Sequence, residues 1–141
     1  MIKITPPKTP LVTVDAVILY KGNSILLIRR KNPPFKGELA LPGGFVDIGE
    51  TVEEACSREA YEETNLHINI IKLVGVFSDP NRDPRGHTIS IAYLCELLQK
   101  DETPKAKDDA LSIEVIPLKK LSSLKLAFDH FEIIEASGIL N

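Results

Sequence analysis

Four residues near the middle of the chain, Arg58, Glu59, Glu62 and Glu63, have the types and spacing to do chemistry. They form the pattern R-E-x-x-E-E near the end of an expected helix, where spacings of three and four put the carboxylates on neighbouring parts of one helical surface. Carboxylates so placed repel one another, and the helix dipole disfavours anions in the last turn. A divalent cation would neutralise the cluster, because Mg²⁺ and Mn²⁺ prefer oxygen ligands. The pattern therefore predicts a site for Mg²⁺, with Mn²⁺ as a possible substitute.

The helix that carries these residues has recognisable ends. Thr51 and Glu54 fit a capping box, in which each side chain accepts a hydrogen bond from the backbone N–H of the other residue. Asn65 follows the acidic residues and tolerates the left-handed conformation in which many helices end. Arg58 lies four residues before Glu62 and can hold that carboxylate in position. We therefore expect a helix between Thr51 and Asn65.

A glycine-containing segment, Pro42-Gly43-Gly44, precedes this helix and predicts a sharp loop. Glycine has no Cβ, so the backbone there can approach a ligand closely and offer a carbonyl oxygen to a metal. The predicted metal ligands are therefore Gly43, Gly44, Glu59, Glu62 and Glu63.

The complete spacing resembles the Nudix box, G-x5-E-x7-R-E-U-x-E-E-x-G-U, where U is apolar. Its fixed positions are occupied by Gly44, Glu50, Arg58, Glu59, Glu62 and Glu63, and Asn65 stands in place of the last glycine. At roughly 7% per residue type, six matches arise by chance at about one in ten million starting points. The alternative is a solvated acidic helix with ordinary ion pairs, and the full spacing disfavours it. The resemblance implies a hydrolase that cleaves nucleoside diphosphates linked to another group.

The order of the remaining elements predicts an α+β fold. Strands are expected at 11–20, 24–30, 38–41, 67–77, 87–97 and 111–116, a helical turn at 117–121 and a C-terminal helix at 127–140. Gly75 marks a possible bulge in its strand. Mixed strands around one helix, followed by a terminal helix, suit an α/β/α sandwich with a mixed β-sheet. The Nudix resemblance implies the same fold, with the box as a loop-helix-loop unit.

Length and composition set wider bounds. A chain of 141 residues suits a single domain over 1–141, in which the proline-rich residues 1–10 form an extended arm. The net charge of −3 gives no basic surface for nucleic acid. No apolar run reaches membrane-spanning length and no secretory signal is present, so we expect a cytoplasmic protein without a membrane partner. Cys56 and Cys95 lack metal-site spacing and are expected to be buried thiols in a reducing compartment.

Two further segments suggest the substrate. The loop at 78–86 resembles that of small microbial ADP-ribose pyrophosphatases, which carry a proline about fifteen residues after the last box glycine, and Pro80 lies fifteen after Asn65. Residues 126–130, LAFDH, recur in ADP-ribose-related Nudix proteins, including ADP-ribose-sensing transcription regulators. These resemblances imply ADP-ribose as the substrate. They also imply a homodimer in which the arm or an adjoining strand crosses to the partner.

Arginine and phenylalanine side chains are the candidates for binding this substrate. Guanidinium groups can form paired hydrogen bonds with diphosphate or ribose oxygens, although a surface ion pair is an equally good explanation for each arginine. The predicted substrate-binding residues are Arg29, Arg30, Phe45, Arg82 and Arg85. Core packing is favoured over adenine binding for Phe77, loop ordering over chemistry for His87, and structural roles for His67 and His130.

The resemblance implies that water attacks one phosphorus of ADP-ribose and releases AMP and ribose 5-phosphate. The family uses either a box glutamate or an acid on a later loop as the base, so Glu59 competes with Asp108, Asp109 and Glu102. Arg58 completes the predicted catalytic set, and Glu50 is expected to be structural or to support the ligands.

Three other functions compete with this interpretation. The first is a nucleoside triphosphate pyrophosphohydrolase of the sanitising type, which would use the same box. The second is an ADP-ribose-binding sensor without hydrolysis, which the intact acidic trio disfavours because binding alone does not require it. The third is a decapping-like RNA enzyme, which the acidic net charge disfavours.

Overall fold

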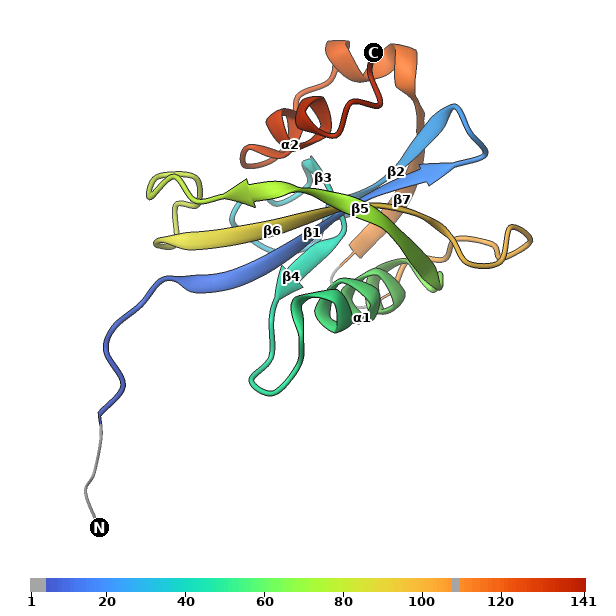
Figure 1. The fold of residues 1–141 in the computed structure, drawn as a ribbon. Helices are drawn as coiled ribbons and strands as arrows, with labels where there is room; N and C mark the ends of the chain where they lie inside the picture. The colour runs from blue at the N-terminus through green and yellow to red at the C-terminus, as the bar shows by residue number, and fades with distance from the viewer. Residues whose placement is uncertain (1–4, 108–109) are drawn as a thin grey trace.

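The computed structural model describes residues 5–107 and 110–141. A mixed sheet forms the middle layer, with helix α1 (Val52–Thr64) on one face and helix α2 (His130–Ala136) on the other (Figure 1). A short 3₁₀ helix, η1 (Leu118–Ser123), lies between the last strand and α2 in the chain. The three layers confirm the predicted α+β sandwich.

Seven strands build the sheet: β1 (Leu11–Tyr20), β2 (Ser24–Arg30), β3 (Leu39–Ala40), β4 (Gly43–Phe45), β5 (Ile68–Phe77), β6 (Thr88–Leu97) and β7 (Ala110–Pro117). Their order is β3-β2-β1-β6-β5, while β4 pairs with β1 and β7 pairs with β2. Strands β1 and β6 are parallel, and the other pairs are antiparallel. The register of β5 against β6 shifts between Leu73 and Gly75, which agrees with the bulge expected at Gly75.

Strand β1 is the centre of the sheet and is covered on both faces. Residues 13–18 are all buried, as in strands that lie between two helical layers. Val14, Ala16 and Ile18 belong to the core beneath α1, whereas Val17 belongs to the core beneath α2. Because side chains alternate along a strand, Asp15 points toward the α2 side. It is the one charged residue in this buried run, and it places a carboxylate inside the protein.

Helix α1 begins and ends as its sequence predicts. Thr51 Oγ1 accepts a hydrogen bond from Glu54 N at 3.1 Å, and Glu54 Oε1 accepts one from Thr51 N at 2.9 Å. Asn65 takes the left-handed conformation with φ of 64°, and its N–H donates to Tyr61 O at 2.9 Å. The small side chains of Ala55 and Ala60 are fully buried against the sheet. They let α1 lie close to the strands.

We predicted a loop at Pro42-Gly43-Gly44, and this prediction was wrong for Gly43 and Gly44. Residues 43–45 form strand β4, which pairs with Thr13, Val14 and Asp15 of β1. The pairing requires glycine, because a Cβ on Gly43 would lie 2.1 Å from the carbonyl oxygen of Val14. The glycine therefore serves strand pairing as well as ligand approach.

The C-terminal helix is also shorter than the predicted 127–140. The N–H of Ala127 donates to Leu39 O at 2.8 Å, so this residue pairs with β3 and does not start a helix. Phe128 has a positive φ of 51°, which is incompatible with a right-handed helix. Helix α2 therefore starts at His130, and Gly138, with φ of 82°, lies just beyond its end.

We expect Gly43→Ala to destabilise the fold, because the clashing atom belongs to the backbone of the central strand. The expected loss is about 1–3 kcal/mol in the free energy of unfolding, measured by urea denaturation. Gly75→Ala is the matched control, since a Cβ there meets only the Phe77 ring at 3.5 Å. Equal stability of the two variants would contradict the role given to Gly43.

Candidate active site

A cavity of about 300 Å³ opens where β4, α1 and the loop between β5 and β6 meet. Its lining includes Gly43, Gly44, Glu59 and Glu63 from the box region. It also includes the predicted substrate-binding residues Arg30, Phe45, Arg82 and Arg85. The fold thus brings the acidic cluster and the candidate binding residues to one place.

The carboxylates of buried Glu63 and half-buried Glu59 form the acidic wall. Glu63 is 4% exposed, accepts a hydrogen bond from Gly43 N at 3.1 Å and shares another with Glu59. Burial, together with the neighbouring Glu59, raises the pKa of Glu63 to about 9, and burial also raises the pKa of Glu59. A Cβ on Gly44 would lie 2.5 Å from Glu59 Oε2, so this glycine leaves room for the carboxylate.

Arg58 connects the acidic residues to one another. Its Nη1 donates to Glu59 Oε1 at 2.8 Å and to Glu62 Oε2 at 3.2 Å, as predicted for Glu62. Its Nε and Nη2 also form a paired contact with Glu50 at 3.0 and 2.6 Å. These hydrogen bonds lower the pKa of Glu50 to about 2. Glu50 therefore anchors Arg58 from the loop before α1, which suits its expected supporting role.

The acidic wall has the donor chemistry for a hard divalent cation. Within residues 5–107 and 110–141, however, no group of three or more His, Cys, Asp or Glu side chains is arranged to hold a metal. In this arrangement Arg58 engages Glu59 and Glu62, while Glu63 turns toward the Gly43 N–H. Two neighbouring carboxylates with raised pKa values still favour a cation over two bare charges. The residues fit a hard divalent cation in their chemistry, because Arg58 bonds only one oxygen of each of Glu59 and Glu62.

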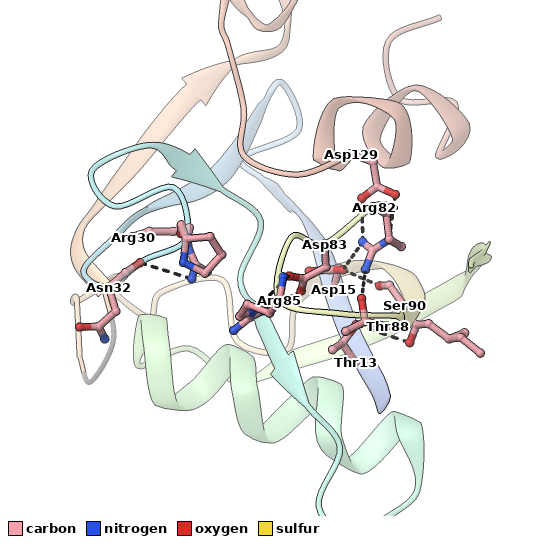
Figure 2. A network of polar contacts seen from close by, with 12 residues as sticks. Thr13, Asp15, Arg30, Asn32, Arg82, Asp83, Arg85, Thr88, Ser90 and Asp129 are labelled. Atoms are coloured by element: carbon pink, nitrogen blue, oxygen red, sulfur yellow. Dashed lines mark hydrogen bonds and ion pairs between the residues drawn. The ribbon is translucent and has the colours of Figure 1, made fainter. Parts of the chain in front are cut away.

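A second polar network, centred on Arg82, also contributes to the lining of the cavity (Figure 2). Its Nε and Nη2 donate to the two carboxylate oxygens of Asp129 at 2.9 and 2.7 Å, and its Nη1 donates to Thr88 Oγ1 at 2.9 Å. Burial alone would lower the pKa of Arg82, but Asp129, Asp15 and Asp83 together raise it. The side chain is 4% exposed. Arg82 thus ties the loop before β6 to the segment that starts α2.

Asp15 links this network to the sheet. It accepts a short hydrogen bond from Ser90 Oγ and lies 3.9 Å from the Arg82 guanidinium. His130 Nδ1 accepts from Leu41 N at 2.9 Å, so the ring proton resides on Nε2, which lies 3.3 Å from Asp15 Oδ1. The structural role expected for His130 therefore has a defined basis.

The predicted substrate-binding arginines differ in where they point. Arg30 and Arg85 reach the cavity, whereas Arg29 does not line it. Arg29 Nε instead pairs with Glu114 at 2.5 Å, because successive side chains of a strand point to opposite faces. Arg82 lines the cavity with its guanidinium bound by Asp129 and Thr88. Substrate contacts by any of them stay predictions.

The structure describes one of the three candidate bases on the later loop, Glu102. Asp108 and Asp109 lie outside the described residues. The chain just before them passes beside the end of α1, where Lys107 N donates to Glu63 O at 3.2 Å. Glu102 instead lies 3.0 Å from His67 and does not line the cavity.

Sequence reasoning missed Asp15, Asp83, Thr88, Phe128 and Asp129 as cavity or network residues. Two signals in the sequence could have identified some of them. A lone carboxylate inside the apolar run 11–20 has to find a partner when it is buried. The LAFDH segment puts Asp129 and His130 side by side, and both join the network. The remaining aromatic candidate, Phe77, packs against the core beneath α2, as favoured. His87 Nε2 contacts Ser78 O at 3.0 Å and so orders its loop.

The model of the NUDIX domain family matches residues 9–136. The chain belongs to this family. It is 54% identical, over 126 residues, to an ADP-ribose pyrophosphatase from Methanocaldococcus jannaschii, covering 89% of this chain and 72% of the relative. These findings confirm the predicted enzyme class, a Nudix hydrolase similar to an ADP-ribose pyrophosphatase.

Two solved structures of the family are similar over most of the chain. The NUDIX domain of Shewanella oneidensis NrtR complexed with ADP ribose superposes with a TM-score of 0.83 at 29% identity, covering 93% of this chain and 88% of that one. A bifunctional NMN adenylyltransferase/ADP ribose pyrophosphatase from Francisella tularensis, complexed with AMP and a Mn ion, gives 0.78 at 37% identity. That match covers 93% of this chain and 42% of the other.

Among the described residues, neither α1 nor any other helix has the length and apolar character of a membrane-spanning segment.

Arg82→Met should destabilise the protein strongly, because it leaves the buried Asp15 and the half-buried Asp129 without their cation. We expect a loss of about 3–5 kcal/mol in the free energy of unfolding. The matched control is Arg29→Met, whose pair with Glu114 is partly exposed and should cost at most about 1 kcal/mol. A stable Arg82→Met protein with impaired substrate binding would instead make Arg82 a substrate contact.

Glu63→Gln should raise the melting temperature in chelator, and the gain should increase with pH. The folded state holds the Glu63 proton more tightly than the unfolded chain, so wild-type stability falls as pH rises from about 4.5 toward about 9. The amide variant lacks this loss. Mg²⁺ should then stabilise the wild type more than the variant, with exposed Glu135→Gln as the control. A pH-independent difference in melting temperature would contradict the assignment.

Proposed function

We propose that this protein hydrolyses the diphosphate bond of ADP-ribose in a Mg²⁺-dependent reaction, giving AMP and ribose 5-phosphate. The observation that carries the proposal is the meeting of Glu59 and Glu63 with Arg30 and Arg85 in one cavity. The 54% identity to an ADP-ribose pyrophosphatase and the likeness to a NUDIX domain complexed with ADP ribose support it. We further propose that residues 1–141 form a single domain.

In the proposed reaction, the residues of the acidic wall and of β4 would bind the metal. Glu59, Glu62 and Glu63, with a carbonyl of Gly43 or Gly44, would hold the cation. When bound, the cation supplies positive charge that offsets the charge developing on phosphorus and makes water easier to deprotonate. Mn²⁺ is a reasonable substitute, since both ions accept oxygen ligands and a related structure contains a Mn ion.

Arg58 is the positioning residue of this site. It holds the Glu59 and Glu62 carboxylates at 2.8 and 3.2 Å and is itself anchored by Glu50. Arg30 and Arg85 point guanidinium groups toward the same cavity and can donate hydrogen bonds to phosphate oxygens. The general base is Glu59 or one of the loop aspartates, Asp108 and Asp109. Glu59 is held against the cavity wall, whereas the loop follows a segment that passes beside α1.

A sensor that binds ADP-ribose without cleaving it is the second candidate. The complex of NrtR with ADP ribose favours this alternative. The complete set Glu59, Glu62 and Glu63 favours hydrolysis, since binding alone does not require three carboxylates in this place. A nucleoside triphosphate pyrophosphohydrolase would use the same box and is distinguished by its substrate.

The deciding experiment compares kcat/KM for ADP-ribose, dGTP, 8-oxo-dGTP and diadenosine polyphosphates. ADP-ribose should be preferred, with AMP as product, and Glu59→Gln should lose at least about 100-fold in kcat because an amide binds a hard cation poorly. Asp108→Asn and Asp109→Asn should lower kcat if the loop supplies the base, and should stay within a few-fold of wild type if Glu59 does. Preference for a triphosphate with release of pyrophosphate, or tight ADP-ribose binding without turnover, would overturn the proposal.

We also propose that the protein is a homodimer. Strand β5 lies at one edge of the sheet and carries exposed Ile71, Leu73 and Val76, while Leu11 and Val12 are exposed beside the extended arm. Exposed apolar side chains on an edge strand favour pairing with another chain.

A cytoplasmic location fits the buried thiols Cys56 and Cys95, which are free although their sulfurs lie 4.0 Å apart.

Light scattering at micromolar concentration should give twice the chain mass of 15.6 kDa. Leu73→Lys should shift the mass toward the monomer, because it places a charge in the proposed interface. Lys72→Arg is the control, as it keeps the charge of an exposed neighbour on the same strand. A wild-type mass of one chain would refute the dimer.

A further inference from the structure

The guanidinium of Arg85 lies near two phenylalanine rings at the wall of the cavity. Its central carbon is 5.1 Å from the centroid of the Phe45 ring and 5.8 Å from that of Phe128, whose ring also has the Arg30 guanidinium at 5.0 Å. Asp83 holds the same guanidinium from the side, with hydrogen bonds of 3.1 Å to Nε and 2.8 Å to Nη2. All of these side chains line the cavity that also contains Glu59 and Glu63.

Contacts with neighbouring residues fix the positions of both phenylalanine residues. Phe45 belongs to β4, directly after Gly44, and its carbonyl accepts a hydrogen bond from Arg58 Nη2 at 3.0 Å. Phe128 packs edge-on against Phe35 at 4.7 Å and lies 5.2 Å from the His130 ring. Its backbone has a positive φ of 51°, an uncommon conformation for a bulky residue. Such a conformation persists only where surrounding contacts impose it, and it directs the ring to the cavity.

A guanidinium and a nucleobase are both planar groups that stack on aromatic faces. We propose that Phe45 and Phe128 form a stacking slot for the base of the nucleoside half of the substrate, and that Arg85 leaves this slot when the base enters. The inference rests on the proposed function. It places the base beside Gly44, and therefore places the attached phosphates near the acidic wall.

Arg85 is suited to leave, whereas Arg82 is not. The Arg85 side chain is 44% exposed, so its guanidinium borders solvent, and leaving the slot would cost it the paired contact with the buried Asp83. The turn that carries it does not depend on this position, because Asp83 Oδ1 also accepts from the backbone N of Arg85 at 2.9 Å. Arg82, only 4% exposed and bound to Asp129, keeps the rest of the loop in place.

The test compares a ligand that has the base with one that lacks it. AMP and ribose 5-phosphate both carry a ribose 5-phosphate unit, so the ratio of their affinities isolates the contribution of the base. It is measured by calorimetry with Mg²⁺ present. Phe45→Leu and Phe128→Leu should each lower the preference for AMP about fivefold to tenfold, the lower part of what one stacked base contributes. Phe77→Leu, in the core away from the cavity, is the matched control and should leave the ratio unchanged.

The Arg85→Ala variant distinguishes two roles of Arg85. Either the base displaces its guanidinium, or the guanidinium contacts the bound base. If Arg85 vacates the slot, its removal should leave the AMP preference unchanged or increase it, whatever it does to the phosphates. An unchanged ratio in Phe45→Leu, or a fall in Arg85→Ala as large as that in the phenylalanine variants, would overturn the slot. Phe45 is 38% exposed, so this variant decides the outcome should Phe128→Leu fold poorly.

The result is independent of whether the proposed reaction occurs. A protein that does not hydrolyse ADP-ribose but loses its AMP preference in Phe45→Leu would keep the slot and lose the proposed function. A protein that hydrolyses ADP-ribose with the same AMP preference in wild type and Phe45→Leu would keep the function and lose the slot.

Discussion

The close approach of β4 to both β1 and α1 is the constraint on which the site depends. On one side, Gly43 lets the backbone of β4 pair with the central strand. On the other, Gly44 lets the carboxylate of Glu59 lie against the backbone, where a Cβ would collide with it. This packing buries Glu63 as well, and leaves it the Gly43 N–H as its backbone donor. The geometry that joins the two layers is thus the geometry that concentrates negative charge.

Arg58 and Arg82 both form ion pairs with the acidic residues around the cavity, but in different ways. Arg58 lies on α1, is 27% exposed and spreads its donors over Glu50, Glu59 and Glu62. It bonds one oxygen of each of Glu59 and Glu62, so each carboxylate keeps an oxygen that Arg58 does not bind. The Arg82 side chain is buried, and its partners belong to the sheet and to the start of α2, so removing it would leave the buried Asp15 and the half-buried Asp129 without their cation. The first arrangement leaves oxygens for another ligand, and the second joins the sheet to α2 at the wall of the cavity.

The parts of the fold that the sequence predicts are those decided locally. The capping box, the end of α1 at Asn65 and strands 11–20 and 24–30 depend on residues close together in the chain, and they were placed correctly. Strand β4 and the start of α2 were not, because long-range pairing with β1 and β3 overrides the local pattern. The same holds for the site. Spacing along one helix brought out Glu59 and Glu63, whereas the pairing of Arg82 with Asp129 joins residues 47 positions apart.

The balance of charge in the cavity bears on how metal and substrate depend on each other. Among the described residues that line it, five are acidic and four are basic, and Arg82 is already committed to Asp129. A diphosphate entering this space would meet the acidic wall as well as the guanidinium groups. Glu63 keeps its proton up to a pH of about 9, and the remaining carboxylates offset part of the attraction to arginine. A divalent cation bound there would give the wall a positive charge. Under the proposed function, we therefore expect substrate and cation to favour each other's binding, and linkage requires the effect to be equal in both directions.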